Sequence, residues 1–249
     1  MFDVIAFDAD DTLWHNETIF TVTQDKFRQL VEPYLRSSWT GQELFETEVR
    51  NLRYFGYGIK GFVLSMIETA IEMTGGQIPS HEIRKIIDFG KAMLDTPVQL
   101  LDHVERVIPA LVRSYTLMII TKGDLFDQET KIAKSGLAEY FTHIEILSDK
   151  TTKTYQAVFN KYGIDPQRFM MVGNSLRSDI LPVIALGACA VHIPYHVTWA
   201  HEIVSHHEIG DLQYFELEHI GLLPGLIESL TRAPGVKTRR RRAKGVHHG

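Results

Sequence analysis

The stretch Phe7-Asp8-Ala9-Asp10-Asp11-Thr12-Leu13 decides how the rest of the chain is interpreted. It follows Val4-Ile5-Ala6-Phe7, a short apolar run that is typical of a strand buried on both faces of a parallel sheet. Ionised carboxylates at the end of such a strand are costly unless their charge is compensated, and a divalent cation would compensate it. Because side chains alternate along a strand, Asp8 and Asp10 are expected on one side and Ala9 on the other.

Two carboxylates with this spacing can divide one reaction between them. Asp8 would attack a substrate, and Asp10 would move the proton. The alternative is a loop of solvated acids that caps the following helix. Distant segments of the chain carry matching chemistry, and they favour the first interpretation.

Length, composition and charge limit the class of protein. With 249 residues, of which 44% are hydrophobic, the chain can form one large domain or one domain plus an insert. The net charge of −5 argues against a nucleic-acid-binding protein. The single cysteine, Cys189, cannot form an internal disulfide and fits a reducing compartment. No basic leader and no run of about 20 apolar residues is present, so a soluble cytoplasmic protein is expected.

Residues 18–96 are expected to be mainly helical. Apolar residues recur there at helical spacing, and Gly75-Gly76 ends one of the helices. The helical stretch is roughly 80 residues long, far more than a crossover between parallel strands needs. The simplest interpretation is a helical cap, inserted after the first strand and placed above the sheet edge that carries Asp8 and Asp10.

The second half of the chain alternates between strands and helices. Further strands are expected at residues 116–121, 144–147, 169–172 and 190–193. This alternation predicts an α/β fold with a doubly wound parallel sheet and right-handed crossovers. The expected domains are an α/β core of residues 1–14 and 97–231, an all-α cap of residues 15–96, and a basic tail of residues 232–249.

The tail contains Arg239-Arg240-Arg241-Arg242 and Lys244. It could be a basic arm that binds nucleic acid or an acidic partner. The alternative is a solvated, disordered terminus, which is common at chain ends and is the favoured interpretation.

Polar residues follow the later strands at the edge where ligands bind in doubly wound sheets. At Thr121-Lys122-Gly123, a hydroxyl and backbone N–H groups of a glycine turn could hold phosphoryl oxygens. Lys150, after the third strand, could neutralise a nucleophilic carboxylate and a phosphate oxygen. After the fourth strand, Asn174 and Asp179 supply oxygen ligands of the type that Mg²⁺ accepts, although either could instead cap the next helix.

These four segments resemble the motifs of the haloacid dehalogenase (HAD)-like hydrolase superfamily, in the phosphatase branch with a helical cap after the first motif. The resemblance covers nearly the whole chain. The first motif, Asp-x-Asp-x-Thr, is present as Asp8-Ala9-Asp10-Asp11-Thr12, and Thr121 and Lys150 match the second and third. The fourth motif usually begins Gly-Asp; here Asn174 replaces that acid and Asp179 is the remaining one.

The resemblance implies a Mg²⁺-dependent phosphomonoester hydrolase that acts on a small phosphorylated metabolite. Asp8 would form an aspartyl-phosphate, and Asp10 would protonate the leaving alcohol and then activate water. The metal would be held by Asp8, the Asp10 backbone carbonyl, and Asn174 or Asp179, a choice that stays open. The remaining phosphate oxygens would be held at Thr121, Lys122 and Lys150.

Two alternatives to a phosphatase are considered. The resembling dehalogenases carry a tyrosine where this chain has Asp10, because a departing halide needs no proton whereas an alcohol does. Asp10 therefore favours a phosphatase over a dehalogenase or a related phosphoryl transferase. The alternative outside enzymes is a non-catalytic binding protein that uses the basic tail. No membrane partner is expected.

Two more stretches are candidates for contact with the substrate. Residues 192–199 leave the fifth strand with two histidines and two aromatic residues, and they either line the pocket or form a packed exit loop. Residues 53–60 of the cap combine aromatic residues with glycines, and they either reach the substrate or pack between cap helices.

Overall fold

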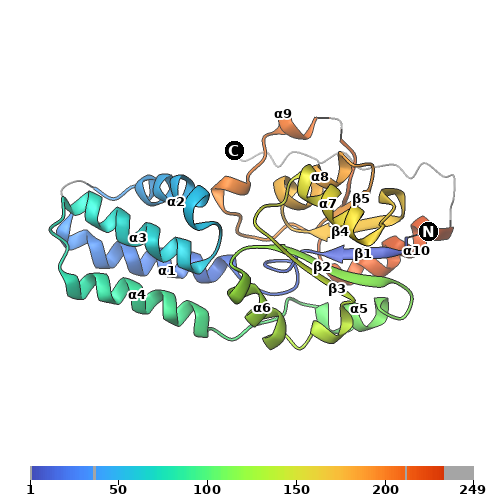
Figure 1. Cartoon of the computed structure of the whole chain (residues 1–249), viewed down its shortest axis with the longest axis horizontal. Coiled ribbons are helices and arrows are strands. Elements are labelled where there is room, and N and C mark those ends of the chain that lie inside the picture. Colours follow the sequence, from blue (N-terminus) through green and yellow to red (C-terminus); the bar gives the residue numbers. More distant parts are fainter. Residues whose placement is uncertain (1, 36–37, 211, 233–249) are drawn as a thin grey trace.

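The computed structural model describes residues 2–35, 38–210 and 212–232. Figure 1 shows an α/β core at one end and a bundle of helices at the other. The basic tail predicted for residues 232–249 lies outside the described residues, except for Arg232. None of the helices in the described ranges is long and apolar enough to cross a membrane.

The core is built on a six-stranded sheet in which every neighbouring pair is parallel. Its strands are β1 (Val4–Phe7), β2 (Thr116–Lys122), β3 (His143–Leu147), β4 (Phe169–Gly173), β5 (Cys189–His192) and β6 (Phe215–Glu216). The order β3-β2-β1-β4-β5-β6 places the first strand in the centre, where Val4 pairs with Thr116 on one side and Phe169 on the other. The doubly wound parallel sheet predicted from the sequence is therefore confirmed.

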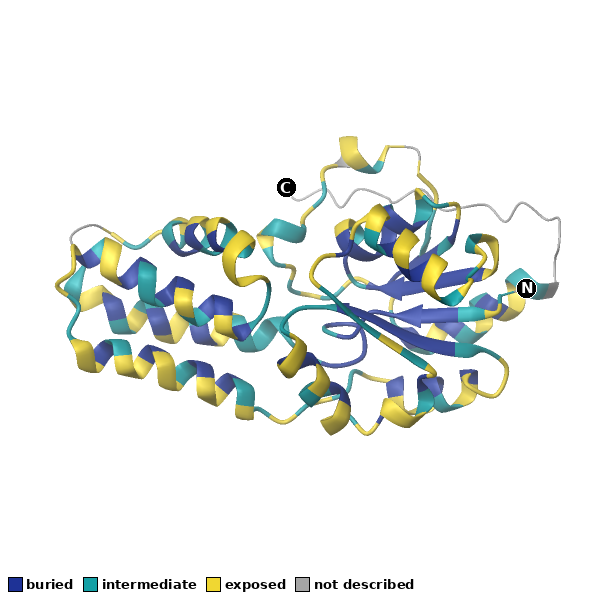
Figure 2. Cartoon of the chain, in the orientation of Figure 1, coloured by how far each residue is buried: buried dark blue, intermediate teal, exposed yellow. Residues whose placement is uncertain are grey.

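Much of the sheet is buried (Figure 2), and separate clusters of hydrophobic residues pack on its two faces. Ile5 and Phe7 of β1 pack against the side that is covered by α5 (Val104–Leu111) and α10 (Leu223–Arg232). Ala6 points to the opposite side, which α7 (Thr152–Tyr162) and α8 (Leu181–Ile184) cover. The alternation follows from strand geometry and explains why β1 is apolar throughout.

Of the helices between β1 and β2, the first four α-helices form a helical insert, the part predicted to be the cap. They are α1 (Glu17–Val31), α2 (Gln42–Phe55), α3 (Ile59–Thr74) and α4 (Ser80–Asp95). The insert has a hydrophobic cluster of its own, which includes Phe27, Phe62 and Ile86. α3 ends at Gly75, which adopts the left-handed conformation with φ 61°, as the glycine pair predicted.

The remaining elements are short. They are α6 (Leu125–Lys134), α9 (His206–Ile209) and the 3₁₀ turns Glu32–Tyr34, Ala138–Tyr140, Pro166–Arg168, Ala200–Glu202 and Ile220–Leu222. The stretch after β4 begins with a π-helical turn at Leu176–Ile180, which leads into α8. β6 was not predicted, because two residues carry no recognisable periodicity.

The carboxyl end of β1 faces the helical insert (Figure 1). The parallel ladder continues one residue beyond the strand, since Asp8 N–H donates to the Val172 carbonyl oxygen over 2.9 Å. The side chains that follow β1, β2 and β4 therefore gather at one edge of the sheet, below the insert.

Candidate active site

A cavity of about 170 Å³ lies at this edge, between the sheet and the helical insert. Residues from both parts of the molecule line it, and so do residues of the segment that follows β5. The structure brings every site residue predicted from the sequence to this cavity, namely Asp8, Asp10, Thr121, Lys122, Lys150, Asn174 and Asp179.

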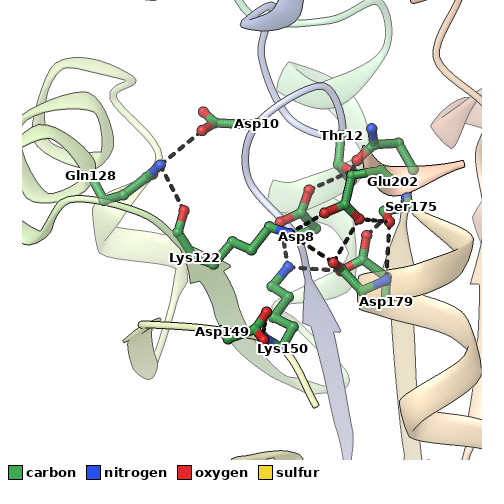
Figure 3. A network of polar contacts seen from close by, with 12 residues as sticks. Asp8, Asp10, Thr12, Lys122, Gln128, Asp149, Lys150, Ser175, Asp179 and Glu202 are labelled. Atoms are coloured by element: carbon green, nitrogen blue, oxygen red, sulfur yellow. Dashed lines mark hydrogen bonds and ion pairs between the residues drawn. The ribbon is translucent and has the colours of Figure 1, made fainter. Parts of the chain in front are cut away.

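Asp8 is joined to Lys150 and Asp179 in a buried ionic group (Figure 3). Lys150 Nζ lies 2.5 Å from Asp8 Oδ1 and 2.7 Å from Asp179 Oδ1, and the lysine side chain is only 1% exposed. Burial alone would lower the pKa of Lys150, but the two carboxylates outweigh it and raise the pKa. Lys150 is thus a permanent positive charge beside the predicted nucleophile.

The second oxygen of Asp8 meets Thr12 and Asn174. Thr12 Oγ1 donates to Asp8 Oδ2 and to Asn174 Oδ1, in both cases over 3.2 Å. The Asn174 amide ends 3.1 Å from Asp8 Oδ2 and 3.2 Å from the Asp10 carbonyl oxygen. If the side-chain oxygen of Asn174 points to this side, it faces Asp8 Oδ2 and the Asp10 carbonyl oxygen. A cation between these three oxygens would then compensate their mutual repulsion. Turned over, the amide would donate N–H groups to the other two oxygens.

These three oxygens fit a magnesium ion. Neighbouring ligands of an octahedral ion with bonds of 2.0–2.1 Å lie about 3 Å apart, close to the separations around Asn174. Within the described ranges, no cluster of three or more His, Cys, Asp or Glu side chains is arranged to hold a metal. A metal site here therefore depends on the amide of Asn174 and the carbonyl of Asp10, together with Asp8.

Asp179 has different partners. Its Oδ1 accepts from Lys150, and its Oδ2 accepts from Ser175 N–H over 3.0 Å. Gly173 makes room for it, because a Cβ at that position would lie 2.3 Å from Asp179 Oδ2. The contacts favour Asn174 as the metal ligand of this motif and Asp179 as the partner that holds Lys150 in place.

Asp10 is held by a separate set of donors, of which Figure 3 shows Gln128. Both of its oxygens lie 2.8 Å from Lys131 Nζ. Gln128 Nε2 donates to it over 2.8 Å, and Trp14 Nε1 donates over 2.7 Å. Burial would lower the pKa of Lys131, but Asp10 and Asp127 outweigh this effect and raise it.

Sequence reasoning missed this set of partners for Asp10. Gln128 and Lys131 are three residues apart and therefore share a face of α6, which follows β2 directly. That spacing was the one available signal, but a helix sequence does not say which face meets the cavity. Trp14, which follows the first motif, is 1% exposed, and its ring N–H positions Asp10.

Lys122 and Thr121 lie at the end of β2 with different surroundings. Thr121 is 1% exposed and lines the cavity. Lys122 Nζ donates to Ser178 Oγ over 2.9 Å, forms an ion pair with Glu202, and lies 4.2 Å from the centre of the Tyr57 ring. The role of Lys122 in phosphate binding stays a prediction, because its charge is already paired in this arrangement.

Glu202 is a further site residue that sequence reasoning missed. It accepts hydrogen bonds from the hydroxyls of Ser175 and Ser178, over 2.5 and 2.7 Å, besides its ion pair with Lys122. Burial would raise the pKa of Glu202, but Lys122 and the hydroxyl donors outweigh it and lower the pKa. Glu202 lies in the segment after β5, where nothing in the sequence pattern singles it out.

The two stretches considered for substrate contact reach the cavity in part. Val197, Thr198 and Trp199 line it, which supports the pocket interpretation of the segment after β5. From the insert, Tyr57 also lines the cavity, with its neighbouring glycines. Tyr54, by contrast, is 66% exposed and contributes nothing to the wall.

Burial raises the pKa values of several acids around the cavity. Burial raises the pKa of Asp8 to about 7, although Lys150 opposes the shift. It also raises the pKa of Asp11 and of Glu17 to about 7. The pKa of Glu48 rises to about 8, because burial and the charge of Glu17 outweigh a hydrogen bond from Trp199. Without a cation nearby, the folded protein therefore retains protons on these acids near neutral pH.

We expect the metal-free protein to lose stability as the pH rises from 6 to 8.5. The four acids have ordinary values near 4 when unfolded, so the folded state binds more protons across this window and stability falls with pH. His201, whose pKa burial lowers, has the opposite effect but is a single group. Thermal unfolding with EDTA should give a midpoint about 5 °C lower at pH 8.5 than at pH 6. A midpoint that rises over this range would contradict the assignment.

Comparison with known proteins gives a family match over most of the chain. The model of the haloacid dehalogenase-like hydrolase family matches residues 2–187. No curated protein sequence matches the chain. Among solved structures, a haloacid dehalogenase-like family hydrolase from Xanthomonas campestris is 37% identical, with a TM-score of 0.81. The match covers 92% of this chain and 91% of the other.

More distant structures share the fold but differ in activity. A 2-haloacid dehalogenase from Pseudomonas syringae pv. Tomato is 17% identical, with a TM-score of 0.61, over 92% of this chain and 99% of the other. A predicted phosphoglycolate phosphatase from Haemophilus somnus is 16% identical, with a TM-score of 0.62, over 91% and 98%. At such identities the likeness shows the fold alone. The extent of the family match, with the Xanthomonas structure, establishes that this chain belongs to the haloacid dehalogenase-like hydrolase family.

Proposed function

We propose that the chain is a Mg²⁺-dependent phosphomonoester hydrolase that forms an aspartyl-phosphate on Asp8. The observation that carries the proposal is the convergence of Asp8 Oδ2, the Asp10 carbonyl oxygen and the Asn174 amide. Hydrolases of this family generally use Mg²⁺. When bound there, the ion would neutralise a phosphate oxygen next to the nucleophile.

Asp8 and Asp10 would divide the chemistry. An Asp8 carboxylate oxygen attacks phosphorus, the P–O bond of the ester breaks, and the leaving oxygen takes a proton from Asp10. Water then attacks the phosphorus of the aspartyl-phosphate and gives its proton to Asp10, which releases Asp8 and inorganic phosphate. Lys150, already in contact with Asp8 Oδ1, stabilises the negative charge of the transferring group.

Asp10 must change partners to carry the proton. Its carboxylate accepts hydrogen bonds from Gln128 and Lys131 on α6 and from Trp14. A substrate in the cavity would compete for the carboxyl group, and the turn toward the leaving oxygen would exchange these contacts. We propose that this exchange accompanies substrate binding.

The cavity suits a small phosphate ester better than a haloacid. A 2-haloacid carries a carboxylate, which needs a cationic group to hold it. Along the part of the cavity wall that the structure describes, no arginine occurs, and the lysines Lys122, Lys131 and Lys150 are all paired with acids. The volume of about 170 Å³ and the helical insert favour a small metabolite over a phosphoprotein.

Phosphate and halide release together test this function. The full chain should release phosphate from p-nitrophenyl phosphate in the presence of Mg²⁺, and EDTA should abolish the activity. No halide should be released from 2-chloropropionate under the same conditions. Halide release, or a failure to release phosphate from any small phosphomonoester with Mg²⁺ present, would contradict the proposal.

The Asp10→Asn variant should distinguish between leaving groups. An alkoxide needs a proton to depart, whereas p-nitrophenolate leaves without one. We therefore expect the variant to lose about 10²–10⁴-fold in kcat on an alkyl phosphate and clearly less on p-nitrophenyl phosphate. Steady-state kinetics on the two substrates measures the difference. Equal losses on both would show that Asp10 does not donate the proton.

A further inference from the structure

The wall of the cavity on the side of the helical insert differs from the core side. It includes Glu17 of α1, Glu48 and Asn51 of α2, and Ser65 of α3. In the proposed function the phosphate group occupies the core side, next to Asp8. The rest of the substrate would then face the insert, and its chemistry can be inferred from what this wall offers.

Asn51 offers an acceptor to a ligand. Both hydrogens of its Nδ2 are committed, one to Ser65 Oγ over 3.2 Å and one to Glu68 Oε2 over 2.7 Å. Ser65 Oγ in turn donates to the Gly61 carbonyl oxygen over 2.9 Å. The donors of both side chains are therefore in use. The side-chain carbonyl oxygen of Asn51, a residue that is 5% exposed, remains as an acceptor.

One carboxyl oxygen of Glu48 is also available to a ligand. Trp199 donates a hydrogen bond to its carboxyl group. Its Oε1 is buried and has no hydrogen-bond partner among the described residues. A buried, unpaired carboxyl oxygen is costly, and a ligand that donates to it would remove the cost.

Among the described residues that line the cavity, no lysine or arginine is paired with the acids at this end. The lysines of the cavity are committed to core acids: Lys150 to Asp8 and Asp179, Lys131 to Asp10 and Asp127, and Lys122 to Glu202. Glu17 lies close enough to raise the pKa of Glu48 through its charge. Near neutral pH burial keeps protons on Glu17 and Glu48, so a cationic ligand group at this wall would be stabilised as these carboxyls ionise, and it would meet oxygen acceptors.

We propose that the substrate carries an ammonium group at the end remote from its phosphate, and that Glu48 determines this specificity. The inference rests on the proposed phosphatase function. The substrate class is then the phosphomonoester of a small amino alcohol or amino sugar. Asn51 supplies an additional acceptor for the ammonium hydrogens, and Glu17 adds a second carboxyl group that the ammonium charge would help to ionise.

The same wall should reject a substrate with a second anionic group. A carboxylate or second phosphate would be placed near Glu48 and Glu17, where the described lining residues include no unpaired cation to hold it. An anionic group there would have no counter-charge, and any of these carboxyls that ionised beside it would repel it. Phosphoglycolate and bisphosphates are therefore expected to be poor substrates.

Three matched esters test the inference on the full chain with Mg²⁺: phosphoethanolamine, 2-hydroxyethyl phosphate and phosphoglycolate. They differ in one terminal group, which is an ammonium, a hydroxyl and a carboxylate. We expect kcat/KM for the ammonium ester to exceed that for the hydroxyl ester about 10-fold and that for the carboxylate about 100-fold. Equal values, or a preference for the hydroxyl or carboxylate ester, would overturn the inference.

In the Glu48→Gln variant, the ratio of kcat/KM for the ammonium ester to kcat/KM for the hydroxyl ester should fall to nearly one. The matched control is Glu46→Gln, an exposed acid on the same helix, which should keep the wild-type ratio. An unchanged ratio in Glu48→Gln would remove Glu48 as the determinant. If Glu48→Gln fails to fold, the wild-type ratio still decides the substrate class. If the wild-type protein hydrolyses p-nitrophenyl phosphate but has equal kcat/KM values for the matched esters, only this inference is overturned. If it hydrolyses no ester at all, the proposed function is overturned.

Discussion

Replacing Asp8 with asparagine is expected to abolish turnover, with kcat lowered by at least about 10⁴-fold. An amide cannot attack phosphorus as a carboxylate does, so the aspartyl-phosphate would not form. The fold should persist, because asparagine is nearly isosteric and Lys150 keeps its contact with Asp179 at 2.7 Å. Phosphate release from p-nitrophenyl phosphate, measured with Mg²⁺, gives the result.

A matched control separates this effect from a loss of structure. Asp102→Asn changes an acid on the surface of the α/β part of the chain, and it should leave both kcat and the unfolding midpoint unchanged. Burial raises the pKa of Asp8 to about 7, so its replacement should not destabilise the metal-free protein at neutral pH. An Asp8→Asn enzyme with wild-type turnover would exclude Asp8 as the nucleophile.

Replacing Lys150 with methionine should damage both activity and stability. The side chain is 1% exposed and lies between Asp8 and Asp179. Its removal leaves buried carboxylates without a counter-charge, and breaking a buried pair in this way costs about 3–5 kcal/mol. A loss of about 10³-fold in kcat is also expected, because the lysine stabilises charge on the transferring phosphoryl group.

Thermal unfolding and steady-state kinetics of Lys150→Met measure the two effects. Lys153→Met is the control, since it removes an exposed lysine only three residues away. The loss of stability should be smaller at pH 6 than at pH 8, because Asp8 accepts a proton as the pH falls through about 7. Wild-type stability and activity in Lys150→Met would show that the ion pairs seen here are not required.

Much of the fold and the centre of the site could be predicted from the sequence. Apolar runs such as Val4–Phe7 must be buried on both faces, and their alternation with helices allows few topologies other than a doubly wound sheet. Once the strands are parallel, the residues that follow them meet at one edge. Asp8, Lys150 and Asp179 therefore converge although 171 positions separate the first from the last.

The contacts of Asp10 and Lys122 could not be predicted in the same way. Lys131 reaches Asp10 from α6, and the facing of a surface helix depends on packing that the local sequence does not encode. Glu202 reaches Lys122 from an irregular segment, for which no periodic pattern exists. The choice between Asn174 and Asp179 as metal ligand was open in the sequence, and the hydrogen bonds of Asp179 to Lys150 and Ser175 favour Asn174.

The central claim is that Asp8 accepts the phosphoryl group, and trapping the acyl phosphate tests it most directly. The full chain would be mixed with substrate and Mg²⁺, quenched in acid within milliseconds, and reduced with borohydride, which converts an aspartyl-phosphate to homoserine. Peptide mass spectrometry then locates the modified residue. The account predicts homoserine at position 8, and none when substrate is omitted. Turnover without any modification of Asp8, or with modification of another carboxylate, would contradict it.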